Sequence, residues 1–350
     1  MILTVYPTVV LLAASVLTVA AGCRHSGPGT ASPPTRCRET RRLMGVPWTI
    51  TMYAESDAVG RRAIAAAFAE IERLEGILSD YDPESEVSLL SAAAPTQTPV
   101  PLSEDLWRVL REAVAWRDKT AGAFDPTVGP LTTLWRQARR SGAMPRADRL
   151  AAARQAVGAK TLELDEDRKI AMLLAPAMRL DLGGIGMGYA IDRGMGVLAG
   201  QGITAAMIDA SGDIAVSGPP PGASAWMIDV AAFGDRDDGD RMTLALVNAA
   251  VTTSGDAFQA VEIDGVRYSH IVDPRTGLGV TGPAAVTVIA TDCTTADAVA
   301  TAASVLGPEA GLAFVESVPG AAARFVTSTA GEFRETRSSR WPSQIAQSRR

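Results

Sequence analysis

Two long stretches of the chain carry apolar residues at every third or fourth position, which is the spacing of an amphipathic helix. The first covers residues 61–79. The second covers residues 102–119, where Ser103 precedes the apolar positions as a candidate N-cap. We expect shorter helices over three further ranges: 148–157, 188–198 and 295–306.

Between residues 205 and 288 the pattern changes to short β-type runs broken by Gly, Asp and Pro, which is typical of antiparallel sheets. The runs are 206–208, 214–216, 227–230, 243–246 and 285–289, and a further strand is expected over 48–53. Helices and strands do not alternate as they do in a parallel α/β protein. We therefore predict an α+β fold with mixed, largely antiparallel sheets, packed helices and a single catalytic unit.

The composition narrows the possible classes of protein. Of the 350 residues, 47% are hydrophobic and 21% are charged, which supplies a sizeable core and excludes a disordered or collagen-like chain. The formal charge of -6 disfavours nucleic-acid binding, which depends on a basic surface. The cysteines Cys23, Cys37 and Cys293 form no CxxC pair, so zinc ribbons, iron–sulfur clusters and a disulfide scaffold are not expected. Their spacing leaves open whether Cys37 and Cys293 pair.

The N-terminus has the features of an export signal. Residues 1–22 contain no charged side chain, and the apolar run 9–17 has the length of a signal-peptide core. Ala-Ala-Gly then precedes Cys23, which resembles a bacterial lipoprotein box. No Lys or Arg precedes the run, and Ala20 stands where Leu is usual, so an ordinary cleaved signal and an uncleaved anchor are alternatives. All of these export the protein, and we expect a lipid anchor on the cell membrane, facing the periplasm or the cell exterior.

Both ends of the chain differ in composition from the part between them. Residues 23–42 are rich in Gly, Pro, Ser, Thr and Arg and are predicted to be a flexible tether. Residues 336–350 are polar and basic and are predicted to be a disordered tail. The folded catalytic part is then expected over residues 43–335. His25 falls in the tether, which argues against a catalytic role for it.

Two glycine-rich segments are candidates for ligand binding. Residues 122–130 form a loop in which Asp125 precedes a proline, although composition alone favours a simple turn between helices. Residues 181–188 form a turn that leads into a predicted helix, where free N–H groups and the helix dipole favour a phosphate. The spacing of these glycines matches neither the dinucleotide fingerprint nor a Walker motif.

Two later segments contain candidates for acid–base and metal chemistry. His270 is the single histidine of the expected folded part, and Asp273 and Arg275 could orient it or bind an anion, a structural role being the alternative. Asp297 and Thr301 are four residues apart and so share one face of a helix. A carboxylate and a hydroxyl suit a hard cation such as magnesium better than zinc. The alternative is that Asp297 only adds charge to the first turn and Thr301 only packs.

Taken in order along the chain, these motifs resemble the flavin transferase (ApbE) family over about residues 43–315. The matching stretches are Met44-Gly45, Ser79-Asp80-Tyr81, Ser85-Glu86-Val87-Ser88, AFDPTVGP from Ala123, DLGGIGMGYAIDR from Asp181, TSGD from Thr253, HIVDPRTG from His270 and DCTTADAVATA from Asp292. The resemblance implies an ApbE-like fold related to the T-fold, and an enzyme that is an FAD:protein FMN transferase. Such enzymes cleave the pyrophosphate of FAD with magnesium, pass FMN to a Thr or Ser hydroxyl of an acceptor protein, and release AMP.

The resemblance also implies roles for individual residues. The positions that would contact FAD are Met44, Tyr81, Ala123, Phe124, Asp125, Asp181, Met187 and Ile271. The backbone carbonyl of Gly184 and the side chains of Asp297 and Thr301 would hold magnesium. His270 would be needed for transfer, as the base beside the incoming hydroxyl, with Asp256 and Asp273 as weaker candidates. Met187 stands where the family usually has lysine, so we expect the enzyme to bind FAD more weakly.

The resemblance implies two partners, FAD and an acceptor protein with a Thr or Ser to be flavinylated. The acceptor would be a membrane or extracytoplasmic redox subunit. Two other activities stay open. One is an FAD pyrophosphatase that gives FMN and AMP, and the other is a flavin-binding lipoprotein without turnover.

Overall fold

The structure is a computed structural model that describes residues 33–230, 242–255, 260–281, 284–329 and 332–342. The chain divides into two units at residue 33, and all the helices and strands below belong to the second unit, residues 34–350. The predicted signal peptide and Cys23 lie outside the described residues.

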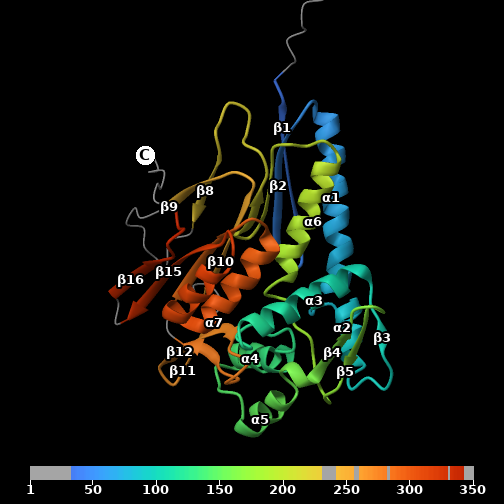
Figure 1. Ribbon diagram of the computed structural model, residues 1–350, viewed down its shortest axis with the longest axis vertical. Helices are drawn as coiled ribbons and strands as arrows, with labels where there is room; N and C mark the ends of the chain where they lie inside the picture. Colours follow the sequence, from blue (N-terminus) through green and yellow to red (C-terminus); the bar gives the residue numbers. More distant parts are fainter. Residues whose placement is uncertain (1–32, 231–241, 256–259, 282–283, 330–331, 343–350) are drawn as a thin grey trace, which may run out of the picture. The chain divides into compact units, whose positions relative to one another are not determined.

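An eight-stranded antiparallel sheet forms the centre of this unit (Figure 1). Its hydrogen-bonded pairs join strands from both ends of the chain, so the sheet brings distant segments together. In spatial order the strands are β1 (Thr35–Leu43), β2 (Val46–Ala54), β6 (Ala206–Ala210), β7 (Asp213–Val216), β10 (Ala249–Gly255), β14 (Ala284–Ala290), β15 (Ala322–Thr329) and β16 (Glu332–Arg337).

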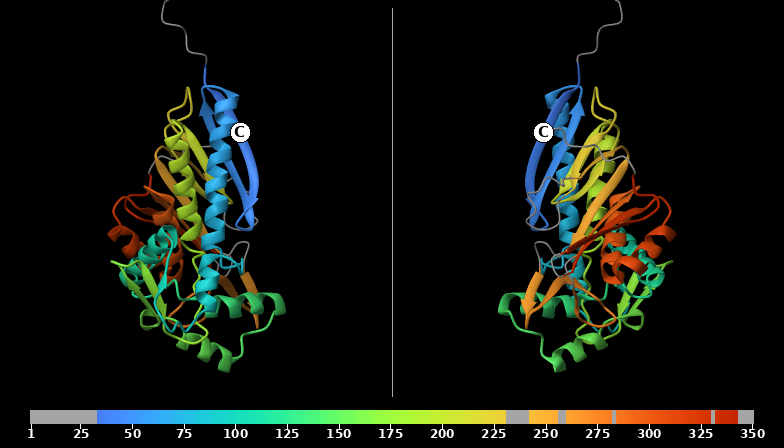
Figure 2. Two further views of the ribbon diagram at one scale, coloured as in Figure 1. Left: turned by 90° about the vertical axis from the view of Figure 1, so that its right-hand side faces the viewer. Right: turned by 90° about the vertical axis from the view of Figure 1, so that its left-hand side faces the viewer.

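Three helices cover one face of this sheet: α1 (Asp57–Leu78), α6 (Gly186–Gly200) and α7 (Cys293–Ser317). Helices α1 and α6 lie side by side, and α7 packs against α6 and against β10 and β14 (Figures 1 and 2). Their apolar faces fill the main core, where Phe68, Ile71 and Ile191 are fully buried. Burial of these faces supplies most of the stability of such helices.

A two-stranded ribbon, β8 (Trp226–Val230) and β9 (Met242–Leu246), belongs to a second apolar cluster. Buried Trp226, Ile228 and Val230 alternate along β8 with exposed residues, as expected for a strand with one buried face. The same cluster contains Ile214 and Val251 from the central sheet.

The remaining elements surround the end of α1. The helices are α2 (Glu86–Ala92), α3 (Glu104–Lys119), α4 (Gly129–Ser141) and α5 (Ala147–Gln155), with a 3₁₀ turn at Ala159–Thr161. One small sheet contains β3 (Val100–Pro101), β5 (Ile170–Leu173) and β4 (Leu162–Asp165), and another contains β11 (Ala260–Ile263), β12 (Val266–Val272) and β13 (Gly279–Thr281). Leu131 and Trp135 of α4 pack against the second small sheet in a third apolar cluster.

The α+β prediction is confirmed, and the expected helices correspond to α1, α3, α5, α6 and α7. Ser103 caps α3, because its hydroxyl accepts a hydrogen bond from the Leu106 N–H at 3.3 Å. The predicted end of the last helix at residue 306 coincides with a kink in α7 at Gly307, whose φ of 78° lies outside the helical region.

The predicted tether and the predicted tail both include residues that belong to the fold. The tether prediction for residues 23–42 is wrong from Thr35 onward, because β1 begins there and pairs with β2 along its whole length. The tail prediction for residues 336–350 is wrong up to residue 342, because β16 reaches Arg337 and Trp341 is buried in the second apolar cluster. The rest of the tail, residues 343–350, lies outside the described residues.

Among the described residues, α7 is the one helix long and apolar enough to cross a membrane. Its first half packs against α6 and the central sheet, and Ala296, Val299 and Ala303 are fully buried there. We therefore assign α7 to the core of the fold.

Candidate functional site

The glycine-rich turn and the start of α7 lie in direct contact. The N–H of Gly188, in the first turn of α6, donates a hydrogen bond of 3.2 Å to Oδ2 of Asp297. A Cβ atom on Gly188 would lie 2.4 Å from the backbone oxygen of Cys293, so only glycine permits this approach. The structure thus brings two of the four sequence motifs together.

The loop of residues 122–128 lies next to the same glycine-rich turn. A Cβ atom on Gly184 would lie 2.8 Å from Oγ1 of Thr301 and 3.1 Å from Cε2 of Phe124. The bare backbone of Gly184 therefore leaves a small cradle beside the Thr301 hydroxyl, lined by an aromatic edge. Thr301 follows Asp297 by one turn of α7, so their side chains share a face of the helix.

The electrostatics around Asp297 favour a cation. Burial raises the pKa of the Asp297 carboxyl well above its usual range, and the nearby carboxylates of Asp213 and Asp192 raise this pKa further. The pKa of Asp213 is itself raised to about 7, by burial and by Asp209. A divalent cation bound to Asp297 would offset this concentration of negative charge.

The donor atoms also suit magnesium. Among the described residues no group of three His, Cys, Asp or Glu side chains could hold a metal ion, so a metal here would need other donor atoms as well. The available groups are a backbone carbonyl at Gly184, the carboxylate of Asp297 and the hydroxyl of Thr301, which are all hard oxygen donors. The residues expected to hold magnesium thus fit that ion by their chemistry and by the cradle between them.

A salt-bridged group centred on Arg136 brings Asp181 and Tyr81 together. Arg136, on α4, pairs with Asp80 at 2.6 Å and with Asp181 at 3.2 Å. Its guanidinium carbon lies 4.2 Å above the ring of Tyr81, whose side chain is otherwise 73% exposed. Burial, and then the carboxylate of Asp181, raise the pKa of Asp80, while Arg136 lowers it. Thr132 adds a hydrogen bond of 2.7 Å to Asp181.

Asp125 lies at one wall of a cavity of about 580 Å³. Its carboxylate accepts hydrogen bonds from the N–H and the hydroxyl of Thr127, at 2.9 and 2.6 Å, and burial raises its pKa. Arg275, which follows His270 in the same motif, lines the same cavity together with Arg117 and Arg154. The structure therefore joins the Asp125 loop to the His270 segment across an open space.

His270 and Ile271 lie on β12, in the small sheet that packs on α4. Trp135 and Tyr268 hold this sheet in place with ring centroids 5.0 Å apart, and β12 also contacts α7. Both His270 and Ile271 are half-buried. The weaker candidate Asp273 forms an ion pair of 2.9 Å with Arg275, and Asp256 lies outside the described residues.

The two methionines expected to contact FAD both pack partly against the main core. Met44 is in the turn between β1 and β2 with a positive φ of 48°, and its N–H donates a hydrogen bond of 2.7 Å to Glu75 near the end of α1. Leu78, one turn further along α1, faces Gly186 at the start of α6. Met187 follows Gly186 in α6 and packs partly against the main core.

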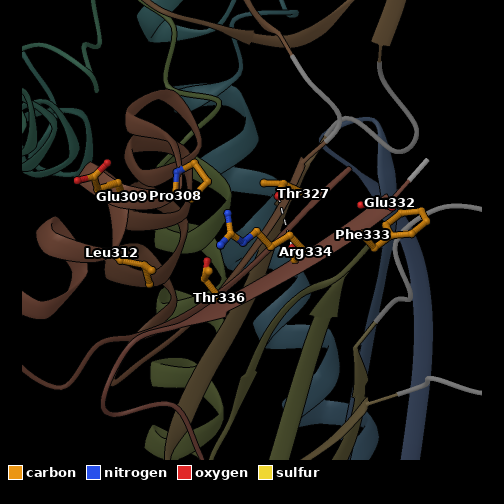
Figure 3. A pocket seen from close by; sticks show the side chains of 8 residues that line it. All are labelled: Pro308, Glu309, Leu312, Thr327, Glu332, Phe333, Arg334 and Thr336. Carbon is orange, nitrogen blue, oxygen red and sulfur yellow. Dashed lines mark hydrogen bonds between the residues drawn. The ribbon is translucent and has the colours of Figure 1, made fainter. Parts of the chain in front are cut away.

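Another cavity, of about 990 Å³, contains none of the site residues predicted from the sequence. It lies between α7 beyond its kink and the outer strands β15 and β16, and Figure 3 shows Arg334 and Thr336 facing Leu312 across it. Its size alone does not make it the functional site, because the motifs converge elsewhere.

Comparison with known proteins shows the family to which the chain belongs. The family model described as the ApbE family matches residues 44–325. The chain belongs to the ApbE family. An FAD:protein FMN transferase of Treponema pallidum is 29% identical over 322 residues, which cover 87% of this chain and 89% of the relative. One of Klebsiella pneumoniae is 31% identical over 287 residues, with 81% and 87% of the two chains covered.

Solved structures of the family have the same fold. The flavin transferase ApbE of Vibrio cholerae has a TM-score of 0.77 at 29% identity, and the match covers 88% of this chain and 98% of that one. The apo flavinyl transferase ApbE of Pseudomonas stutzeri has a TM-score of 0.76 at 28% identity, covering 87% and 95%. The predictions of the family and of its fold are confirmed.

The sequence analysis did not identify Arg136, which contacts Asp80, Asp181 and Tyr81 at the candidate site. Arg136 lies on α4, which was not predicted: residues 122–130 were interpreted as a loop, and no element was assigned to residues 131–147. Leu131, Trp135 and Ala138 are all buried and follow a helical spacing, so the pattern contained a usable signal. Nothing in the sequence indicated that Arg136 would reach both Asp80 and Asp181.

Proposed function

We propose that this chain transfers the FMN half of FAD, in a magnesium-dependent reaction, to a Thr or Ser hydroxyl of an acceptor protein and releases AMP. The enzyme class, FAD:protein FMN transferase, follows from the family and its relatives. The observation that supports the rest best is the convergence of Gly184, Asp297 and Thr301 beside Phe124.

The metal would be held by the Gly184 carbonyl, the Asp297 carboxylate and the Thr301 hydroxyl. When bound, magnesium supplies charge neutralisation for a pyrophosphate whose phosphorus–oxygen bond breaks. Asp297 keeps its orientation through the Gly188 N–H, and the bare backbone of Gly184 keeps space beside Thr301. The N-terminus of α6 adds the positive end of the helix dipole, which favours a phosphate.

The flavin side of the substrate would meet Tyr81, Phe124 and Asp125. The exposed ring of Tyr81, fixed by Arg136 beneath it, offers a flat apolar face of the kind on which planar rings stack. Asp125 offers polar atoms at the wall of the neighbouring cavity. Asp181 is held by three groups, so it can accept hydrogen bonds without moving. Ala123, Met44, Met187 and Ile271 complete the proposed contacts.

His270 is the proposed base for the acceptor hydroxyl. A neutral imidazole can accept a proton from a hydroxyl, and Pro274 and Arg275, which follow the strand of His270, line the cavity that Asp125 also lines. Replacing His270 by Ala should lower the transfer rate by about 10² to 10⁴, while the Kd for FAD stays within about twofold. An unchanged transfer rate would refute the role of His270.

The reaction is tested by measuring AMP released from FAD with magnesium, with and without a peptide that contains a candidate Thr or Ser. AMP together with a fluorescent flavinylated peptide supports the transferase. AMP together with free FMN indicates a pyrophosphatase, and FAD retained without AMP indicates a flavin-binding protein. Asp297→Ala should abolish AMP release, whereas Asp57→Ala, on the exposed start of α1, should leave it unchanged. Full turnover in Asp297→Ala would contradict the metal assignment.

We also propose that the protein is exported and held at the membrane by lipid on Cys23, which would place it near membrane or extracytoplasmic redox acceptors. The apolar run before Cys23 and the small residues next to it support this proposal. Labelled palmitate should enter the wild-type protein and not a Cys23→Ser variant, and that variant should leave the membrane fraction. Mass spectrometry of exported proteins, with and without the gene, should find an added FMN on Thr or Ser of the acceptor.

A further inference from the structure

A carboxylate on α6 caps the N-terminus of α7 from outside that helix. Oδ1 of Asp192 accepts a hydrogen bond of 2.9 Å from the N–H of Cys293. Its Oδ2 accepts bonds of 2.8 and 2.5 Å from the N–H and the hydroxyl of Thr294. Asp192 thus satisfies two of the backbone N–H groups that a helix leaves free at its N-terminus.

The end of α7 already has a cap of its own. Asp292, the residue before the helix, accepts a hydrogen bond of 2.7 Å from the N–H of Thr295. One local cap is what most helices have, so a second carboxylate from a different helix is more than the stability of α7 alone requires. Its distinctive feature is that it connects two elements.

A second connection runs in the opposite direction. Asp297 of α7 accepts the N–H of Gly188 of α6, and Gly188 precedes Asp192 by one helical turn. The two carboxylates therefore join the same two helices at two points, each helix contributing one acceptor. Two such connections fix both the rotation and the axial position of α7 relative to α6, since neither helix can turn or slide without breaking a hydrogen bond.

We propose that Asp192 is a positioning residue for the metal site: it holds α7 on α6 so that Asp297 and Thr301 face the backbone of Gly184. The inference rests on the proposed function, because these three residues are the proposed ligands of magnesium. Gly184 lies two residues before α6, whereas Asp297 and Thr301 belong to α7, so the proposed site is split between the two helices that Asp192 connects. Groups that orient metal ligands typically change metal affinity by 10- to 100-fold when they are replaced.

The test compares Asp192→Asn with Asp292→Ala. The amide of Asn retains one acceptor oxygen and turns an NH₂ group toward the donors at Cys293 or Thr294, so the connection loses its charge and one of its two acceptor oxygens with almost no change of size. Asp292→Ala removes the local cap of the same helix and leaves the connection to α6 intact. Mn²⁺ binding to the protein without FAD is measured by electron paramagnetic resonance, the Mg²⁺ concentration for half-maximal AMP release is measured separately, and thermal unfolding is measured for both variants.

Asp192→Asn should raise the Kd for Mn²⁺ and the half-saturating Mg²⁺ concentration by about 10- to 100-fold, with kcat at saturating Mg²⁺ within a few-fold of wild type. Asp292→Ala should lower the unfolding temperature but change both metal constants by less than about twofold. Thr294→Val removes only the hydroxyl bond to Asp192, and it should shift both constants in the same direction by less than tenfold. This variant carries the test if Asp192→Asn does not fold.

The proposal is overturned if Asp192→Asn, or Thr294→Val in its place, loses thermal stability while both metal constants stay at their wild-type values. It is also overturned if Asp292→Ala shifts the metal constants as much as Asp192→Asn does. Failure of the proposed function looks different: the wild-type protein would then bind no Mn²⁺, or Asp297→Ala would bind it as well as wild type.

Discussion

Replacing Gly188 by Ala should force α6 and α7 apart at the proposed site. The new Cβ atom would lie 2.4 Å from the oxygen of Cys293, 2.7 Å from its carbonyl carbon and 2.9 Å from Cα of Thr294. All three are backbone atoms, so no side-chain rotation relieves the overlap. The helices must separate by about 1 Å before ordinary contact begins at 3.4 Å, and the 3.2 Å hydrogen bond from Gly188 to Asp297 cannot survive that separation.

The free energy of unfolding should fall by about 1–3 kcal/mol. Overpacking of a core costs about 1–3 kcal/mol, and the lost hydrogen bond at a buried carboxylate adds about 1 kcal/mol or more. Against this, Ala is favoured over Gly inside a helix by about 1 kcal/mol. The opposing terms leave a net destabilisation because the contact is with backbone. Since Asp297 loses the N–H that orients it, magnesium-dependent AMP release should fall as well.

Two other glycines of the same helix provide matched controls. A Cβ atom on Gly196 has no atom within 4 Å, so Gly196→Ala should raise stability by about 0.5–1 kcal/mol. A Cβ atom on Gly194 would lie 2.9 Å from Cδ1 of Ile208 and 3.2 Å from Cδ1 of Ile71, which are flexible side-chain ends, so this variant should fall between the other two. Urea unfolding of the three variants gives the order. If Gly188→Ala is as stable and as active as Gly196→Ala, the close contact between the helices is not as described.

Three further predictions concern the substrate, pH and the chain end. Met187→Lys, which restores the residue usual in the family, should tighten FAD binding roughly tenfold, the equivalent of one charge-assisted hydrogen bond of ~1.5 kcal/mol; an unchanged Kd in a fluorescence titration would count against it. Hydrogen bonds from Arg73, and then from Arg193, lower the pKa of Glu70 to about 2, so Glu70 stabilises the fold above its unfolded pKa near 4.5 and loses this contribution as the pH falls toward 2. Glu70→Gln should therefore remove that part of the acid dependence of urea unfolding, and an unaltered profile would contradict the interpretation. Trp341→Ala should cost about 3–5 kcal/mol of unfolding free energy, because Trp341 is only 6% exposed; a loss below 1 kcal/mol would show that the chain end does not contribute to the core.

The two errors at the chain ends have one physical cause. β1 and β16 are the two edge strands of the central sheet, and each carries several Arg and Glu side chains. Charged residues on edge strands prevent pairing with other molecules, so such strands do not show the apolar alternation by which inner strands are recognised. Cys37 is the one buried residue of β1, whereas Ile50 and Met52 are both fully buried in the neighbouring β2. A pattern search therefore finds the inner strands and misses the edges.

The sequence was more informative about the site, because its motifs contain residues whose type is dictated by a close contact. Gly184 and Gly188 were recognised as part of a turn, and the structure shows why each is glycine: one leaves space beside Thr301 and the other lies on the backbone of α7. Residues that act across the fold gave no such signal. Arg136 and Asp192 look like ordinary helix residues until the partners of their side chains are known, since those partners lie 45 and more positions away in the sequence.

The contact between α6 and α7 affects both the stability of the fold and the geometry of the proposed metal site. Gly188 sets how closely the two helices approach, and Asp192 sets how they are rotated and aligned. When the two helices are forced apart, both the core packing and the proposed metal site are disturbed. Gly188→Ala should therefore lower the free energy of unfolding and the activity together. Asp192→Asn weakens the hydrogen bonds that align α7 with α6, but it leaves the packing almost intact because the side-chain volume does not change. Metal affinity should therefore fall further than stability does. The two substitutions should therefore give different ratios of metal-affinity loss to stability loss. Equal ratios would mean that the carboxylate of Asp192 does no more than support the fold.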